Sequence, residues 1–485
     1  MNTLAQDLLY VAPEFLVGAM ACVVLLADVF VSAERRQTIG FLLTVATLIG
    51  AMVLSLLIQP AEPVVAFGGQ FVLDGLATLV KIVTYLAVIL VLVYSQHYLR
   101  EWDIAKGEYL VLVLIATLGM LVMASGGSLL TIYLGLEMLS LALYALVAFR
   151  RDSALASEAA MKYFVLGAMA SGMLLYGMSL MYGMTTSLDL QTIALAIADT
   201  SSDGEGLVLK MALVFVLIGL AFKLGAVPFH MWLPDVYHGA PASVTLFVGT
   251  APKLAALAIT LRLLADGFGS LHEQWQGMLV LLAVLSLLVG NVIAIAQQNI
   301  KRMLAYSTIG HVGFILLGLL TGTTEGYSAA LFYTVIYTLM GLGAFGVVVI
   351  LSRNGTEAED LMDFKGLAER NVWLAMLMAL IMFSMAGIPP TVGFYAKLAV
   401  LRPLLDVGYT WLALLAVVLS VVGAFYYLRV IKLMFMDETD SERVHAPAGW
   451  GNWAAVLLSI NGLAMVLLGL FPGWLMQVCH QAMVS

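Results

Sequence analysis

The chain has 485 residues, of which 62% are hydrophobic and 11% are charged, and its mean hydropathy is +1.02. Soluble domains carry roughly 25% charged residues, so the composition indicates an integral membrane protein and no nucleic-acid partner. The formal net charge of -8 says little about partners, because most charges fall in short segments between apolar runs. Cys22 and Cys479 lie near opposite ends of the chain in apolar surroundings. Their spacing gives no indication of a disulfide framework, an iron–sulfur cluster or a metal site.

Apolar segments long enough to cross a lipid bilayer as helices recur along the chain. They predict an all-α polytopic membrane protein with about fourteen transmembrane helices and not a barrel of alternating strands. The first segment contains Glu14 and Asp28 and begins without basic residues, so we interpret it as a retained span rather than a signal peptide. The predicted spans are 8–32, 38–58, 71–95, 109–124, 129–149, 158–183, 208–237, 242–264, 273–297, 303–323, 327–352, 372–401, 410–435 and 453–478.

The basic residues are distributed unequally between the two sides of the predicted membrane. If the loops alternate sides, fourteen lysines and arginines fall on one side and only Lys210, Arg262 and Arg402 on the other. The positive-inside rule then places the protein in a bacterial inner membrane with both termini in the periplasm. Two loop stretches, 188–199 and 361–370, are amphipathic and are expected to lie along the membrane interface.

A weak internal repeat divides the chain. Residues 160–177 align without gaps on residues 329–346, and the GAVP motif at 225–228 parallels the GIPP motif at 387–390. The repeat unit is about five helices, and an odd number of helices makes the second copy enter the membrane from the opposite side. We therefore predict two inverted five-helix repeats, each with a broken helix. The predicted units are helices 1–3 (1–107), the two repeats (108–268 and 269–438) and a C-terminal helix (439–485).

The stretch 222–253 combines charge with helix-breaking residues at membrane depth. Lys223 ends an apolar run and is followed by Gly225 and Pro228. A lysine near the bilayer centre costs a few kcal/mol and is a functional candidate by default. Non-helical backbone at that depth is tolerated only where it is buried in protein or lines a cavity. We expect an ion-conducting protein whose first half is centred here.

Glu137 lies in a predicted span that is otherwise free of charge. A carboxylate there should be protonated or paired, because desolvation disfavours the ionised form. Its natural partner is a lysine on a neighbouring helix, either Lys162 or Lys223. A lysine in such a pair can exchange protons, so opening and closing the pair would act as a gate. A static structural ion pair is the alternative.

Three further residues are candidates for the same pathway. Lys253 starts the apolar part of the eighth span, and Lys397 follows the double proline at 389–390 in the twelfth. Lys397 could instead extend to the membrane surface. His311, in the sequence YSTIGHVGF, could relay protons as a neutral imidazole, or it could be a hydrogen-bonded packing residue. The GLGAFG pattern at 341–346 lies within a predicted span, which favours helix packing over nucleotide binding.

Three longer stretches resemble a known family. They read FKLGAVPFHMWLPDVYHGAP from residue 222, IKRMLAYSTIGHVGF from residue 300 and FSMAGIPPTVGFYAKL from residue 383. They resemble the antiporter-like membrane subunits of NADH:quinone oxidoreductase (complex I) and their relatives in multisubunit cation/proton antiporters. The resemblance covers nearly all of the chain from the third predicted span to the thirteenth.

This resemblance implies a proton-translocating, non-redox subunit of a hetero-oligomeric translocase. NADH, flavin mononucleotide, iron–sulfur clusters and quinone are then expected in partner subunits, with no cofactor and no metal in this chain. In the family, a hydrated axis in the membrane plane carries the protons, and Lys162 would modulate the pair formed by Glu137 and Lys223. The residues that match this axis are Glu137, Lys162, Lys223, Lys253, His311 and Lys397.

Three other functions remain as alternatives. A subunit of a multisubunit sodium/proton antiporter with the same fold would have a nearly identical axis. A purely structural membrane scaffold is disfavoured by the two lysine-bearing broken helices in matching positions. A transporter of soluble substrates fits the architecture, but the sequence offers no second acidic cluster for a coupling ion.

Overall fold

The structure is a computed structural model that describes residues 3–198, 203–352, 355–438 and 452–484. The part up to the eighth span contains α1 (Thr3–Tyr10), α2 (Ala12–Phe30), α3 (Ala33–Leu57), β1 (Val64–Ala66), β2 (Phe71–Leu73), α4 (Gly75–Glu101), α5 (Gly107–Ala124), α6 (Leu129–Val147), α7 (Ala154–Thr185), α8 (Leu190–Ala198), α9 (Asp203–Leu224), α10 (Trp232–Gly239), α11 (Ala242–Val248) and α12 (Ala251–Leu261). The remainder contains η1 (Arg262–Gly267), η2 (Gly269–Leu271), α13 (His272–Ala296), α14 (Ile300–Leu319), α15 (Thr324–Leu351), η3 (Leu361–Phe364), α16 (Leu367–Arg370), α17 (Val372–Ala386), α18 (Val392–Asp406), α19 (Thr410–Phe435), α20 (Asn452–Leu470) and α21 (Gly473–Val484).

Polar side chains fix where several of the long helices begin. The Asp74 carboxylate accepts a hydrogen bond from the backbone N–H of Ala77 at the start of α4, at 2.8 Å. Ser128, Asn299 and Thr323 cap α6, α14 and α15 in the same way. Such caps satisfy backbone donors that have no partner within the helix, and they set the register in which each apolar run enters the bundle.

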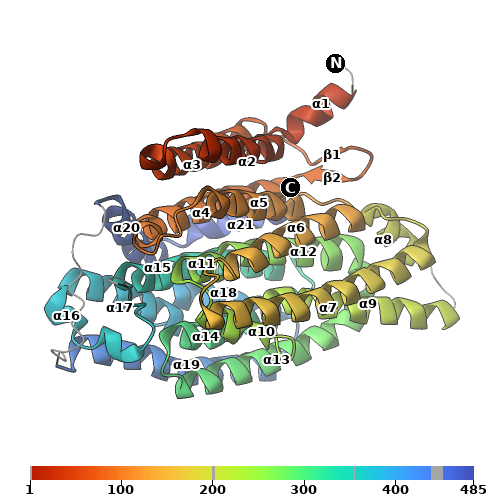
Figure 1. Cartoon of the computed structure of the whole chain (residues 1–485). Helices are drawn as coiled ribbons and strands as arrows, with labels where there is room; N and C mark the ends of the chain where they lie inside the picture. The colour runs from red at the N-terminus through yellow and green to blue at the C-terminus, as the bar shows by residue number, and fades with distance from the viewer. Residues whose placement is uncertain (1–2, 199–202, 353–354, 439–451, 485) are drawn as a thin grey trace.

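The helices run side by side along one direction, with α2 and α3 on one flank and α13 and α19 on the other (Figure 1). The short β1–β2 hairpin marks one end of the bundle, where Phe71 pairs with Gly126 in the α5–α6 connection. We call this end the hairpin side. The opposite end, where α6 finishes near Arg150 and α14 begins at Ile300, next to Lys301, is called the basic side.

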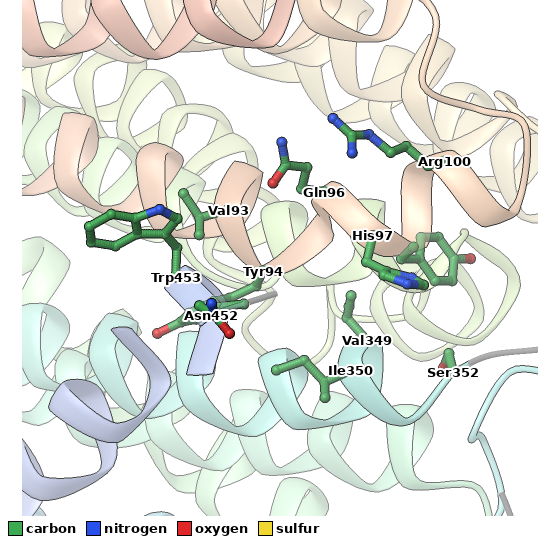
Figure 2. A pocket seen from close by; sticks show the side chains of 12 residues that line it. Val93, Tyr94, Gln96, His97, Arg100, Val349, Ile350, Ser352, Asn452 and Trp453 are labelled. Carbon is green, nitrogen blue, oxygen red and sulfur yellow. The ribbon is translucent and has the colours of Figure 1, made fainter. Parts of the chain in front are cut away.

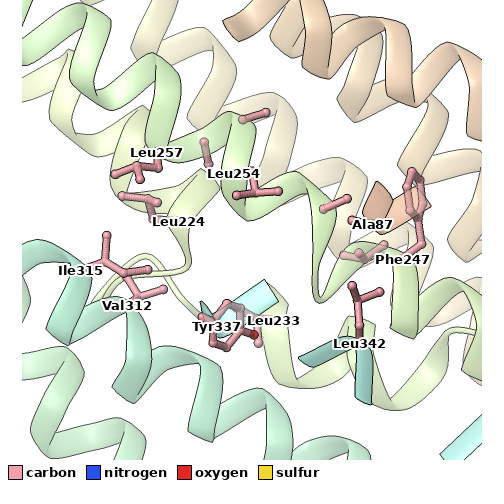
Figure 3. Packing of buried hydrophobic residues seen from close by; sticks show 14 of the residues in the cluster. Ala87, Leu224, Leu233, Phe247, Leu254, Leu257, Val312, Ile315, Tyr337 and Leu342 are labelled. Carbon is pink, nitrogen blue, oxygen red and sulfur yellow. The ribbon is translucent and has the colours of Figure 1, made fainter. Parts of the chain in front are cut away.

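The core is formed by helices that are apolar on every face. The span 242–267, which contains α11 and α12, is completely buried, and α14 and α15 are nearly so. Leu254 and Leu257 of α12 and Val312 and Ile315 of α14 are part of this cluster (Figure 3). Because this span is buried by other helices on every face, a charged residue on α12 lies in the interior of the bundle.

The two helix breaks are built alike. Gly225 and Gly387 both adopt the left-handed conformation, with φ of +82°. In each case the glycine N–H donates to carbonyls three and four residues earlier, and the next residue donates five residues back. An X–Pro peptide follows within a few residues in both places, at Pro228 and Pro390. Glycine is favoured here because a left-handed φ carries no Cβ penalty for it.

We expect Gly387→Ala to destabilise the subunit by more than backbone strain alone. A left-handed alanine costs roughly 1–2 kcal/mol, and the added Cβ would lie 2.9 Å from Cδ and 3.0 Å from Nζ of Lys397. Gly408→Ala is the matched control, because Gly408 has φ of +88° with no atom within 4 Å of the added Cβ. The measurement is the midpoint temperature of thermal unfolding of each detergent-solubilised variant. Equal losses for the two variants would contradict the expected clash.

The all-helical membrane architecture is confirmed. Thirteen helices of the described chain are long and apolar enough to cross a membrane, and the predicted span 372–401 is formed by the shorter helices α17 and α18. The predicted span 453–478 is divided at Pro472 into α20 and α21. The amphipathic stretch 361–370 forms η3 and α16, and 190–198 forms α8, with residue 199 outside the described residues. The inverted repeats and the unit boundaries stay predictions.

Candidate functional site

Glu137 and Lys223 lie close together without forming the direct pair that was expected. Glu137 is half-buried on α6 and accepts a hydrogen bond from the Ser171 hydroxyl of α7. The Lys223 ammonium, in the last turn of α9, donates to Ser140 Oγ at 2.5 Å. Ser140 follows Glu137 by three residues, so the ammonium and the carboxylate meet neighbouring turns of one helix. The Ser140 hydroxyl itself donates to the Leu136 carbonyl, so Ser140 holds Lys223 near Glu137 without contacting the carboxylate.

Lys162 lies elsewhere. Its ammonium is 2.8 Å from Asp235 Oδ2 and 2.9 Å from Glu158 Oε1, and its side chain is 45% exposed. Of the two lysines proposed as the Glu137 partner, Lys162 is thus paired with other carboxylates. Because Asp235 belongs to α10 and also accepts from Arg302 at 2.8 Å, Lys162 ties α7 to the second part of the broken helix.

Lys253 lies in the centre of the bundle, where only 2% of it is exposed. Its ammonium donates to the Leu224 carbonyl at 2.9 Å and lies 5.3 Å from the centre of the Trp232 ring. A cavity of about 20 Å³ is lined by Lys253, Lys223, Ser140 and Tyr163, among other residues. That volume is enough for one water molecule with several polar partners, so a single water could connect the two ammonium groups.

His311 is the centre of a buried hydrogen-bond cluster. Its ring nitrogens lie 2.8 Å from the Tyr333 hydroxyl and 3.1 Å from the Tyr427 hydroxyl, and Tyr427 also shares a hydrogen bond with Ser307. Each of these groups can both donate and accept a proton. A small cavity of about 10 Å³ is lined by His311 and Lys397 among other residues, which places His311 beside the lysine of the second broken helix.

Two residues that sequence reasoning missed join the two halves of the protein. The Tyr337 hydroxyl donates to the Gly249 carbonyl at 3.0 Å, and it lies 2.7 Å from the Thr308 hydroxyl. Gly249 precedes the helix of Lys253, and Thr308 is one turn before His311 on α14. Side-chain hydroxyls are common where membrane helices pack. In the sequence, only the spacing of Thr308 and Tyr337 from His311 could therefore have suggested that they connect the two halves.

Lys397 is held by oxygen atoms. Its ammonium donates to the carbonyls of Met385 and Ala386 at 3.2 and 2.7 Å, and to Ser420 Oγ of α19 at 2.7 Å. It also lies 5.4 Å from the centre of the Phe314 ring. These contacts point the side chain back toward the end of α17, so Lys397 does not extend to the membrane surface.

A second carboxylate–lysine pair was not singled out from the sequence as a site. Glu14 of α2 and Lys81 of α4 are 2.6 Å apart, with side chains 5% and 1% exposed. The sequence showed both residues within apolar spans, which is the available signal. Their pairing could not be derived, because it depends on how α2 packs against α4.

On the basic side, a cluster of charges connects the two halves. Lys301, 1% exposed, lies 2.7 Å from Glu357 Oε2 and 3.1 Å from Glu359 Oε1. Glu357 also accepts from the Tyr98 hydroxyl at 2.5 Å and from Arg150 at 3.3 Å. Burial would raise the pKa of the Glu359 carboxyl, but its bond with a histidine side chain and the charge of Lys301 outweigh burial and hold the pKa well below its ordinary value.

On the hairpin side, Arg262 closes the end of the buried span. Its guanidinium forms two hydrogen bonds with the Asp74 carboxylate, at 2.6 and 2.7 Å, and one with Asp266 at 3.2 Å. A bidentate contact between a guanidinium and a carboxylate is both strong and geometrically specific. It anchors α12 to the start of α4 and so fixes the depth of Lys253.

A separate pocket of about 140 Å³ lies between α4, α15 and α20 near the basic side (Figure 2). His97, Arg100 and Trp453 are among its lining residues. None of the predicted site residues lines it, so this pocket lies apart from the buried lysines. Within the described part of the chain, no group of three or more histidine, cysteine, aspartate or glutamate side chains could hold a metal ion. The GLGAFG motif lies within α15.

Comparisons with known proteins show which family the chain belongs to. Residues 126–423 match the family described as NADH:quinone oxidoreductase/Mrp antiporter, TM. The chain belongs to this family. It is similar to NADH-quinone oxidoreductase subunit N of Thioalkalivibrio sulfidiphilus, with 59% identity over 98% of both chains, and of Acidithiobacillus ferrooxidans, with 54% identity over 100% of this chain and 99% of the relative.

Solved structures of this family share the fold. A chain of respiratory complex I from Thermus thermophilus has 33% identity and a TM-score of 0.80, covering 96% of this chain and 98% of its own. A chain of the Mrp complex from Dietzia has a TM-score of 0.84 over 100% of this chain and 97% of its own, at 22% identity. The second likeness concerns the fold alone. The fold alone does not distinguish a chain of NADH:quinone oxidoreductase from a chain of an Mrp antiporter. The high sequence identity to the subunit N relatives favours the first of the two.

Proposed function

We propose that this chain is a proton-translocating membrane subunit of an NADH:quinone oxidoreductase, corresponding to subunit N. NADH oxidation and quinone reduction take place in partner subunits of the hetero-oligomer, which hold the flavin and the iron–sulfur clusters. This chain takes no part in the redox chemistry. It lies in the bacterial inner membrane with both termini in the periplasm, an orientation supported by the excess of basic residues on the basic side.

The observation that carries the proposal is a row of groups in the bundle interior that can exchange protons. The row begins at Glu137 and Ser140 and continues through Lys223 and the water-sized cavity to Lys253. Tyr337, Thr308, the His311 cluster and Lys397 lie further along it, although among the described residues no hydrogen bond joins Lys253 to Tyr337 or Thr308 to His311. A purely structural scaffold would not require ionisable groups in its centre, because the cost of removing a buried ion pair from water can exceed the attraction between the two charges. Intramembrane lysines more often mark a pathway.

The proposed role of each group is based on its contacts. Ser140 keeps Lys223 close to Glu137, and a shift of α9 relative to α6 would change that contact and release or recapture the ammonium. A proton released from Lys223 passes through the water position to Lys253, which must be a neutral amine to accept it. The proton on Lys253 then moves by way of the hydroxyls of Tyr337 and Thr308 to a neutral His311. Lys397 receives the proton at the second broken helix after its own ammonium has released one. Lys162, held by Asp235, positions α10 and does not carry the proton itself.

Substitution of Lys223 tests this function. We expect Lys223→Ala to lower NADH-driven proton uptake at least about tenfold, because a buried group needed for transfer is lost. Lys223→Arg keeps a charge on the side chain but cannot release a proton, so it should be impaired as well. Proton uptake and quinone reduction are recorded side by side in membranes that contain assembled complex. Wild-type rates in both variants would favour the scaffold interpretation instead.

A further inference from the structure

The carbonyl ends of the two broken helices hold the lysine ammonium groups. The Leu224 carbonyl, which accepts from Lys253, immediately precedes Gly225 at the end of α9. The Ala386 carbonyl, which accepts from Lys397, immediately precedes Gly387 at the end of α17. The last carbonyls of a helix have no partner within the helix and carry the negative end of its dipole. Each of these two helix ends is therefore a site for a positive charge.

The two lysines reach equivalent positions from different parts of the chain. Lys253 comes from the helix after the broken one, whereas Lys397 comes from the second half of the broken helix itself. Each ammonium also lies over an aromatic ring, at 5.3 Å for Trp232 and 5.4 Å for Phe314, an arrangement that attracts cations. The recurring feature is thus the helix end, and the lysine is the cation that occupies it.

The second site is the more complete of the two. Three oxygen atoms surround the Lys397 ammonium at 2.7–3.2 Å: the carbonyls of Met385 and Ala386 and the hydroxyl of Ser420. In transporters with broken helices, unwound carbonyls and half-helix C-terminal ends coordinate sodium ions or protons. The oxygen atoms around Lys397 are likewise helix-end carbonyl oxygens, together with one hydroxyl oxygen, and none of the three belongs to a carboxylate.

We propose that the end of α17, together with Ser420, is a binding site for a small monovalent cation, which the Lys397 ammonium fills. What this implies for ion selectivity rests on the proposed function. Because the ammonium is tethered, sodium cannot take the place of the occupant, and only the proton on the lysine can leave. The site would therefore exclude sodium from the second broken helix, although its oxygen atoms are suited to bind it.

Two substitutions of Lys397 differ in whether they open the site. Lys397→Ala removes the ammonium and most of the side chain, leaving the three oxygen atoms unoccupied. Lys397→Met removes the charge but keeps most of the volume, so it should leave little space for an ion. The measurement is the binding of radiolabelled sodium to purified, assembled complexes, with wild type and Lys397→Met as controls. We expect Lys397→Ala complexes to retain more sodium than either control.

Ser420 gives a second test of the same site. In the Lys397→Ala background, Ser420→Ala should weaken the additional sodium binding about tenfold, which corresponds to the loss of one contact to a charged group. Ammonium ions should compete with sodium for the site. If Lys397→Ala does not assemble, Lys397→Ser is the second variant, because its short side chain also leaves the three oxygen atoms without an ammonium group.

The outcomes separate this inference from the proposed function. Equal sodium binding by the Ala and Met variants, or additional binding that Ser420→Ala leaves unchanged, would overturn the cation site. Neither result depends on proton movement. Conversely, a failure of proton translocation as the function would appear as normal proton uptake in the Lys223 variants, and it would leave the sodium-binding results as they are.

Discussion

Lys253→Met is expected to lower proton translocation roughly 100-fold, the size of effect that a positioned proton-transfer group contributes. Lys253 lines the water-sized cavity beside Lys223, and it follows Gly249, whose carbonyl accepts from Tyr337, by four residues. Methionine fills a similar volume but can neither hold nor release a proton at this position. NADH-driven proton uptake by membrane vesicles, measured together with NADH:quinone reduction, gives the result.

Two further variants separate proton transfer from structural support at Lys253. Lys253→Arg can still donate to the Leu224 carbonyl, but its guanidinium does not lose a proton in proteins, so we expect assembly with little translocation. Lys210→Met is the control for loss of a lysine, because Lys210 is exposed on α9. Normal proton uptake with Lys253→Met would show that the pathway does not pass through α12.

The sequence was sufficient to locate the candidate residues where a charge interrupts an apolar run. Lys223, Lys253 and Lys397 all stand beside glycine–proline breaks or within spans, and such positions are expensive unless they are buried in protein. The helix breaks themselves were predictable as well, since Gly225 and Gly387 occur in matching GxxP and GxPP patterns. These features are local, so they can be recognised without knowing how the helices pack.

The partners of these residues could not be predicted. Lys162 was one of two possible partners for Glu137, yet it pairs with Asp235, which lies 73 residues away along the chain. Whether two intramembrane charges meet depends on the rotation and depth of each helix, and a weak 3.6-residue pattern in uniformly apolar helices leaves both undetermined. The hydroxyls of Thr308 and Tyr337 carry even less signal, because each occurs in a helix where a packing role is equally consistent with its position.

The loop acids show the same limit on the basic side. Glu357 and Glu359 follow the eleventh predicted span in a polar segment, where carboxylates are normally solvated. In the structure Glu357 instead enters the bundle and meets Lys301, Arg150 and Tyr98. Only the folded arrangement of α4, α14 and this segment reveals that the cluster holds the two halves together.

Lys301→Met is expected to have the largest effect on assembly. Removing one partner of a buried ion pair destabilises a protein by roughly 3–5 kcal/mol, because the other charge stays buried without compensation. Here Glu357 would keep the Tyr98 hydroxyl and, as its charged partner, only Arg150 at 3.3 Å, whose side chain is 34% exposed. Its charge would therefore be only partly compensated, which places the expected loss toward the lower end of that range. The Ala240 carbonyl at the end of α10 would also lose its ammonium donor, now at 3.1 Å. The readouts are the yield of assembled complex and the temperature of half-inactivation after solubilisation.

The Lys301 prediction has a control and a compensating variant. Lys432→Met removes a lysine that is 62% exposed and pairs with Asp437, and exposed pairs contribute little, so assembly should be nearly normal. In Lys301→Met/Glu357→Gln the unpaired buried charge is removed as well, and the yield should recover in part. The loss of Lys301 should also change the pH dependence of stability. The pKa of Glu359, which Lys301 lowers in part, should return toward its ordinary value. The stabilisation that the ionised Glu359 provides would then be lost at a higher pH during acidification than in the wild type.

A Lys301→Met complex that assembles in normal yield would show that the two halves are held together by packing of α11, α14 and α15 alone.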